Sequence, residues 1–110
     1  MFMVLAHGEA YTIRKLTPNE WERLQGFPDD WTNVNSSSDT KRYEALGNSI
    51  ALPSWEYVLQ RLTLCCGRNN SMASLFDGIG GFPLIWSRLN GNEACVWSSE
   101  IDKFAMAVTN

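Results

Sequence analysis

A strand, a glycine-rich turn and a helix follow one another at residues 73–89, and this unit constrains the fold more than any other part of the chain. Residues 73–76 have the composition of a buried strand, residues 77–81 form the turn, and residues 82–89 form the expected helix, which ends before Gly91. A second strand at 94–98 and a second helix at 101–108 follow. This order predicts an α/β fold whose parallel sheet is incomplete, because such strands need neighbours and cover on both faces.

The glycines of the turn allow a ligand to approach the backbone. Gly78, Gly80 and Gly81 lack the Cβ atom that would collide with it, and the following helix offers N–H groups that suit an anion. Glu100 lies 20 residues after Gly80, where dinucleotide-binding folds place an acid that binds ribose hydroxyls. The spacing is G-x-G-G, so a turn that serves only tight packing is the alternative. The pattern indicates a nucleoside-containing ligand and does not choose between NAD, ATP and S-adenosylmethionine.

The first part of the chain carries strong helix-boundary signals. Residues 11–16 alternate enough to form a short strand. Thr17 then has the position of an N-cap, Pro18 the first helical position, and Glu20 completes a capping box. We expect this helix to end at Gly26.

A second helix is expected from about residue 53 to residue 64, after a polar loop at 29–40. Apolar side chains recur at helical spacing on one of its faces: Trp55, Val58, Leu59 and Leu62. The following residues, 65–71, are polar, contain Gly67, which is expected to stop the helix, and show no periodic apolar signal. The sequence therefore divides into a segment 1–64, a linker 65–71 and a segment 72–110.

Composition excludes several classes of protein. Apolar residues make up 45% of the chain, which predicts a folded core, and no apolar run is long enough for a transmembrane helix. The N-terminus lacks a secretory signal, and three cysteines without C-x-x-C spacing argue against a disulfide framework and a metal site. These features predict a cytoplasmic protein without a membrane partner. The net charge of −3 does not by itself indicate a nucleic-acid partner.

Four stretches of the chain resemble motifs of the DNA cytosine-5 methyltransferase family. Residues 74–82 closely resemble the first motif, and Ser99-Glu100-Ile101-Asp102 resembles the second. Residues 14–28 are similar to the ninth motif and residues 43–53 to the tenth. The resemblance implies part of the Rossmann-like fold of S-adenosylmethionine-dependent methyltransferases.

The resemblance also implies a cofactor and the residues that hold it. The cofactor would be S-adenosylmethionine, with Glu100 on the ribose hydroxyls and Asn48 and Ser49 at the methionine end. From the residues alone, Asn48 and Ser49 would only form a capping turn after Gly47. The complete set of implied cofactor-binding residues is Asn48, Ser49, Phe76, Asp77, Gly78, Ile79, Gly80, Gly81, Glu100 and Ile101. Three charged residues near the capping box are expected to be scaffold: Arg14, Glu20 and Arg23.

The order of the motifs departs from the family's pattern. The family's usual order places the first motif near the N-terminus and the tenth near the C-terminus, whereas here the ninth and tenth come first. Met72 resembles an ordinary family start joined on after the linker. We interpret the chain as a circularly permuted partial methyltransferase, since such a joint costs little where termini lie close together.

The family's catalytic cysteine lies in a Pro-Cys segment that these residues do not contain. Its thiolate adds to C6 of a flipped cytosine while a glutamate engages N3. Cys65 and Cys66 end an amphipathic helix and Cys95 lies in an apolar strand, so we expect none of them to be the nucleophile and no catalytic residue here.

The leading interpretation is therefore a cofactor-binding fragment of a methyltransferase that acts on cytosine in DNA, as in restriction–modification systems. A non-catalytic subunit of a split enzyme and a degenerate gene product are the alternatives. Apolar side chains that further strands should cover predict self-association or binding to a complementary methyltransferase fragment. Five aromatic side chains are expected to stay partly exposed for this reason: Trp55, Phe82, Trp86, Trp97 and Phe104.

Overall fold

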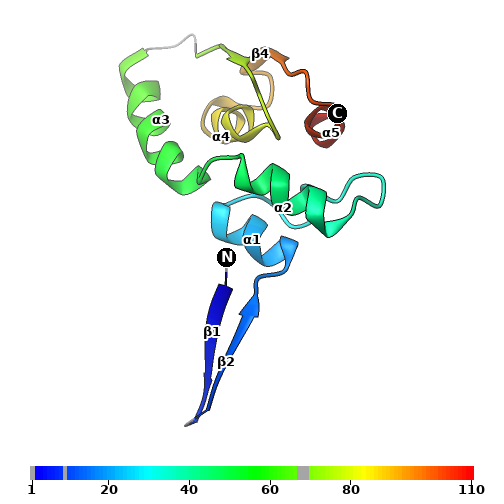
Figure 1. The fold of residues 1–110 in the computed structure, drawn as a ribbon. Coiled ribbons are helices and arrows are strands. Elements are labelled where there is room, and N and C mark those ends of the chain that lie inside the picture. Colours follow the sequence, from blue (N-terminus) through cyan, green and yellow to red (C-terminus); the bar gives the residue numbers. More distant parts are fainter. Residues whose placement is uncertain (1, 9, 67–69) are drawn as a thin grey trace.

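The chain begins with an antiparallel hairpin. The structure is a computed structural model, and it describes residues 2–8, 10–66 and 70–110. Strand β1 (Phe2–His7) pairs with β2 (Ala10–Lys15), with Val4 opposite Ile13. Figure 1 shows this hairpin projecting away from the helices, and both Val4 and Ile13 are exposed. Strand β2 confirms the predicted strand at 11–16, whereas β1 was not predicted.

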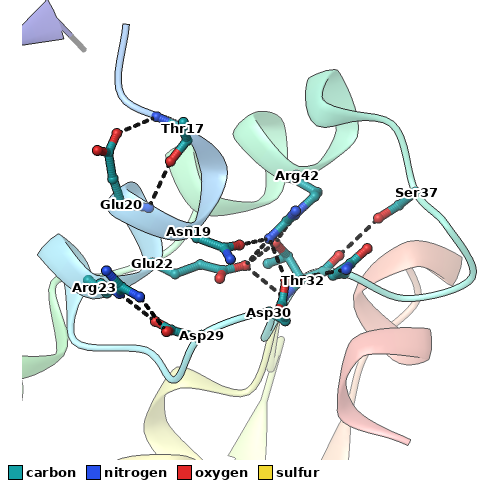
Figure 2. Close-up of polar contacts among 11 residues, drawn as sticks. Thr17, Asn19, Glu20, Glu22, Arg23, Asp29, Asp30, Thr32, Ser37 and Arg42 are labelled. Atoms are coloured by element: carbon teal, nitrogen blue, oxygen red, sulfur yellow. Dashed lines mark hydrogen bonds and ion pairs between the residues drawn. The ribbon is translucent and has the colours of Figure 1, made fainter.

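Helix α1 (Pro18–Gln25) has the predicted boundaries because its caps are local. The Glu20 N–H donates to Thr17 Oγ1 at 3.3 Å, and the Thr17 N–H donates to Glu20 Oε2 at 2.8 Å, which completes the capping box (Figure 2). The helix ends at Gly26, whose φ of 87° lies in the left-handed region that glycine adopts without strain.

Two further helices complete the first segment. Helix α2 (Asp39–Gly47) starts within the region expected to be a loop, so the predicted loop at 29–40 is two residues too long. Helix α3 (Leu52–Cys66) confirms the helix predicted at 53–64 and continues through the first two residues of the predicted linker. The helix stop expected at Gly67 lies outside the described residues.

The second segment has the predicted order of elements. It contains β3 (Met72–Leu75), α4 (Gly81–Asn90), β4 (Cys95–Ser99) and α5 (Lys103–Thr109). Strands β3 and β4 are parallel, with Leu75 opposite Ser99. The expectation of a buried strand at 73–76 was wrong for most positions, since in β3 only Ser74 is buried. Val96 and Trp97 of β4 are exposed as well, because no third strand joins the pair in the described part of the chain.

The two segments share one core. Helices α3 and α4 lie side by side in Figure 1, and the buried apolar residues come from both segments: Phe27, Leu46, Leu52, Leu59, Ile79, Ile85, Trp86 and Ala105. The expectation of an exposed Trp86 was wrong, since its side chain is 4% exposed and its indole N–H donates to the Asn70 carbonyl at 2.7 Å. On α3, Leu59 is buried while Trp55, Val58 and Leu62 remain more than 40% exposed, so the predicted apolar face is only partly covered.

A buried polar network fixes α2 against α1 (Figure 2). The Arg42 guanidinium donates through Nη2 to Asn19 Oδ1 at 2.5 Å and to Glu22 Oε1 at 3.0 Å, and through Nε to Thr32 Oγ1 at 3.0 Å. The backbone N–H and hydroxyl of Thr32 both donate to the same Glu22 oxygen.

The described helices include none long and apolar enough to cross a membrane.

Candidate functional site

A pocket of about 480 Å³ opens where the two segments meet. Three stretches form its walls: helix α2 with the turn after it, the glycine turn at 76–81 with the start of α4, and the turn after β4 with the start of α5. Its volume is in the range of small-molecule sites. The lining residues include most of the predicted cofactor-binding set: Asn48, Ser49, Phe76, Asp77, Gly78, Ile79, Gly81 and Glu100.

Gly80 and Ile101 are not among the residues that line the pocket. A Cβ atom on Gly80 would lie 2.8 Å from Thr109 Cγ2, and the φ of Gly80 is +77°. Close packing of the turn against α5 therefore favours a glycine at this position. The side chain of Ile101 is 91% exposed.

Glu100 holds the glycine turn to the end of β4. Its Oε2 accepts the Gly78 N–H at 2.6 Å, and its Oε1 accepts the N–H groups of Ile101 and Asp102 at 2.7 and 2.9 Å. These bonds, the one from Asp102 foremost, lower the pKa of Glu100. The carboxylate is thus ionised at neutral pH, where it can accept a hydrogen bond from a ligand hydroxyl.

Phe76 and Asp77 have contrasting environments within the turn. Phe76 is 89% exposed and has a φ of +54°, an uncommon backbone conformation for a residue with a side chain. Asp77 is buried and accepts the Ser74 hydroxyl at 2.6 Å. Burial raises the pKa of Asp77, and the negative charge of Glu100 adds to the effect. Asp77 is therefore an internal anchor of the turn, while the ring of Phe76 is free to contact a ligand.

Asn48 and Ser49 form the predicted capping turn and also line the pocket. Their backbone N–H groups donate to the carbonyls of Glu44 and Leu46 at 3.0 and 3.2 Å, which forms the expected capping turn of α2. The same two residues line the pocket opposite the glycine turn.

The pocket also contains residues that the sequence did not indicate. Lys41, Glu44 and Ala45 precede Asn48 at helical spacing, so recognition of α2 as a helix would have placed them on the same face. The remaining ones follow Asn48 or lie on the second segment: Ile50, Phe82, Asp102, Lys103, Phe104 and Ala105.

The C-5 cytosine-specific DNA methylase family matches residues 3–63, which is more than half of the chain. The chain belongs to this family. The family uses S-adenosylmethionine as its methyl donor.

Curated members of the DNA methylase family match different shares of the chain. The type II methyltransferase M.HpaII of Haemophilus parainfluenzae is 56% identical over 41 residues, 37% of this chain. The DNA (cytosine-5)-methyltransferases DRM2 and DRM1 of Arabidopsis thaliana are 36% and 39% identical over 88 and 89 residues, 80% and 81% of the chain. The matches cover only 11% of M.HpaII and 14% of DRM2 and of DRM1.

None of the three cysteines of this DNA methylase family member lines the pocket. Cys65 and Cys66 are exposed at the end of α3, and Cys95 lies in β4. Burial raises the pKa of the Cys95 thiol, and Asp77 raises it further, so the thiol form is favoured. Among the residues that the structure describes, no cluster of metal-binding side chains is present.

Proposed function

We propose that the chain is the S-adenosylmethionine-binding part of an enzyme that methylates C5 of cytosine in DNA. The observation that carries the proposal is the joint pocket: Asn48 and Ser49 of the first segment line the same cavity as Gly78 and Glu100 of the second. The family membership supports methyl transfer to DNA as the activity of the complete enzyme.

The chemistry of the pocket fits this cofactor. The exposed ring of Phe76 offers an apolar face to adenine. A carboxylate has about four acceptor positions, and Glu100 uses three of them for backbone N–H groups, which leaves room for a ribose hydroxyl. Asn48 and Ser49 supply polar groups for the amino-acid end. When bound, the cofactor supplies an activated methyl group on its sulfonium.

We propose further that the chain has a circularly permuted motif order, with segments 1–64 and 72–110 joined by 65–71. The match to DRM2 covers 88 of the 110 residues, and a continuous stretch of that length must include residues 23–88 on both sides of the joint. The structure supports the joint as well. Asn90 of α4 donates to Thr63 Oγ1 at 3.2 Å and accepts from Asn70 Nδ2 at 2.8 Å, so one side chain of the second segment binds both the first segment and the joint.

The methyl transfer itself requires a cysteine from outside these 110 residues. A cofactor-binding subunit of a split methyltransferase is the second candidate, favoured by the exposed apolar side chains of Leu75, Val96 and Trp97 beside the parallel strands. In that case a chain with the Pro-Cys segment would cover this surface.

Calorimetry with S-adenosylhomocysteine, the demethylated product of the cofactor, tests the proposal on the full chain. We expect binding by the wild type and weaker binding by Asn48→Ala, because Asn48 lines the pocket. Asn92→Ala, at an exposed position after α4, is the control and should bind like the wild type. A folded wild type that gives no binding heat would contradict the proposal.

With labelled S-adenosylmethionine and mixed-sequence duplex DNA, we expect no methyl transfer by the chain alone. Transfer that persists after replacement of all three cysteines by serine would show a different mechanism.

A further inference from the structure

We propose that Trp31 and Thr32, in the loop between α1 and α2, are positioning residues that hold two walls of the pocket at a fixed separation. Neither residue lines the pocket. The expected effect on cofactor binding rests on the proposed function, whereas the effect on the glycine turn and α2 does not depend on it.

Trp31 holds the glycine turn. Its indole Nε1–H donates to the Ile79 carbonyl oxygen at 2.8 Å. The N–H of the same peptide group, that of Gly80, donates to the Asp77 carbonyl at 3.1 Å. Because a peptide group is planar, hydrogen bonds at both its oxygen and its nitrogen fix its orientation. This peptide lies in the middle of the turn, between Gly78 and Gly81 of the pocket wall.

The position of the Trp31 ring is itself fixed from two sides. The ring stacks on Phe27, with centroids 6.0 Å apart and an angle of 29° between the planes. A Cβ atom on Gly80 would lie 3.8 Å from Trp31 Cζ2, so the indole is in contact distance of the turn. The indole is therefore a rigid connection between the loop and the turn.

Thr32 holds the opposite wall. Its side chain and N–H both donate to Glu22 Oε1, and its hydroxyl oxygen accepts from Arg42 Nε at 3.0 Å (Figure 2). Arg42 lies in α2 beside the pocket residue Lys41 and six residues before Asn48. Two consecutive residues thus bind the two walls, and consecutive Cα atoms are always about 3.8 Å apart. The spacing between the glycine turn and α2 depends on this pair.

Loss of the indole N–H would leave the Ile79 carbonyl without its partner and allow the peptide to rotate. The amide groups of the turn would then become more mobile without any change in the residues that line the pocket. Trp31→Phe makes this change while it keeps an aromatic ring on Phe27. Trp21→Phe is the matched control, because the Trp21 indole makes no hydrogen bond within the described part of the chain.

The first measurement is amide hydrogen exchange by NMR on the ligand-free full chain. We expect Trp31→Phe to raise the exchange rates of the Gly78 and Gly80 amides about tenfold relative to amides of α3, and Trp21→Phe to leave that ratio unchanged. Unchanged exchange in the turn, or an equal rise throughout the chain, would overturn the proposal.

Two further measurements cover other outcomes. If Trp31→Phe does not fold, the wild type provides the test. The Trp31 indole N–H should exchange about tenfold more slowly than that of exposed Trp55, and equal rates would refute the role of the Trp31 hydrogen bond. Calorimetry with S-adenosylhomocysteine should show about tenfold weaker binding by Trp31→Phe and by Thr32→Val, with Thr32→Ser close to wild type. A wild type that does not bind this ligand would contradict the proposed function, while the exchange rates would still decide the role of Trp31.

Discussion

Arg42 of α2 and Glu22 of α1 form a buried ion pair, with Nη2 and Oε1 3.0 Å apart and side chains 9% and 0% exposed. Arg23 and Asp29 form a second pair at 2.6 Å, but their side chains are 66% and 48% exposed. Water screens the exposed pair, whereas removal of one partner from the buried pair leaves a charge without compensation. The buried arginine therefore contributes more to stability, although the exposed pair has the shorter distance.

Arg42→Met is expected to lower the free energy of unfolding by about 3–5 kcal/mol, enough to unfold much of a small domain. Arg23→Met, the matched control, should lower it much less, because water screens the exposed pair. Urea unfolding of the two variants measures the difference. Equal losses of unfolding free energy in the two variants would contradict the role assigned to burial of the ion pair.

Gly81→Ala is expected to destabilise the chain by about 1–3 kcal/mol. The added Cβ atom would lie 3.1 Å from Ile50 Cγ1 and 3.2 Å from Leu52 Cδ2, and Leu52 is fully buried and cannot move aside. Gly47→Ala places the same methyl group on helix α2 with no atom within 4 Å, so it should be neutral or stabilise by up to about 1 kcal/mol. Thermal unfolding of both variants shows whether each substitution lowers or raises the melting temperature.

Glu20 should contribute to acid unfolding in a defined pH range. Bidentate bonds from Arg14 at 2.7 and 2.8 Å, together with the Thr17 N–H, lower the pKa of Glu20 from 4.5 to about 2. Because the folded state holds this carboxyl ionised, its stabilisation is complete above pH 4.5 and is lost as the pH falls through about 2. The free energy of unfolding should therefore fall less steeply between these values in Glu20→Gln than in the wild type. Glu93→Gln, at an exposed position, should show the same pH dependence as the wild type. If Glu20→Gln showed it too, the lowered pKa of Glu20 would not contribute to acid unfolding.

Glu100→Ala is expected to weaken binding of S-adenosylhomocysteine, because hydrogen bonds to a charged group are stronger than those between neutral groups. The change removes both the acceptor for the ribose and the bond that holds the Gly78 N–H. Glu93→Ala is the control. Calorimetry that gives equal affinities for the wild type and Glu100→Ala would eliminate Glu100 as a ribose ligand.

The isolated chain is expected to self-associate through the side of β4. Trp97 is 53% and Val96 61% exposed, and a strand with an open edge and apolar side chains tends to find a partner. Light scattering across a concentration series should show a rising mass for the wild type and a lower one for Trp97→Lys. Tyr11→Lys, on the projecting hairpin, tests the alternative surface. A constant monomeric mass for the wild type would refute association altogether.

The sequence predicted those elements whose boundaries depend on neighbouring residues. Thr17, Glu20 and Gly26 define α1 by themselves, and the order of strands and helices after Met72 follows from short-range patterns. Strand β1 lacks the alternation of apolar and polar residues typical of a half-buried strand, because its exposed positions Phe2, Val4 and Ala6 are apolar as well. Helix α2 buries only Arg42 and Leu46, so its apolar signal is weak and its helical state depends on contacts with α1.

In the pocket too, residues close in sequence could be predicted together, whereas residues brought together by packing could not. Gly78 and Glu100 were found together because both belong to one strand–helix–strand unit. Lys41 and Glu44 could not be placed near them, since their position depends on how α2 packs against a segment 30 or more residues further along the chain. The hydrogen bond from Trp31 to Ile79 is of this kind too, because it joins residues 48 positions apart.

The packing of α3 on α4 has a consequence for how the chain folds. Only residues 67–80 separate the two helices, so their contact closes a short loop. The entropy lost on closing a loop grows with its length, by about 0.6 kcal/mol for each doubling. Contacts between elements close in sequence form fast because little chain must be ordered first. We therefore expect the α3–α4 pair to be an early folding nucleus, on which the loop with Trp31, helix α2 and finally the ligand pocket assemble.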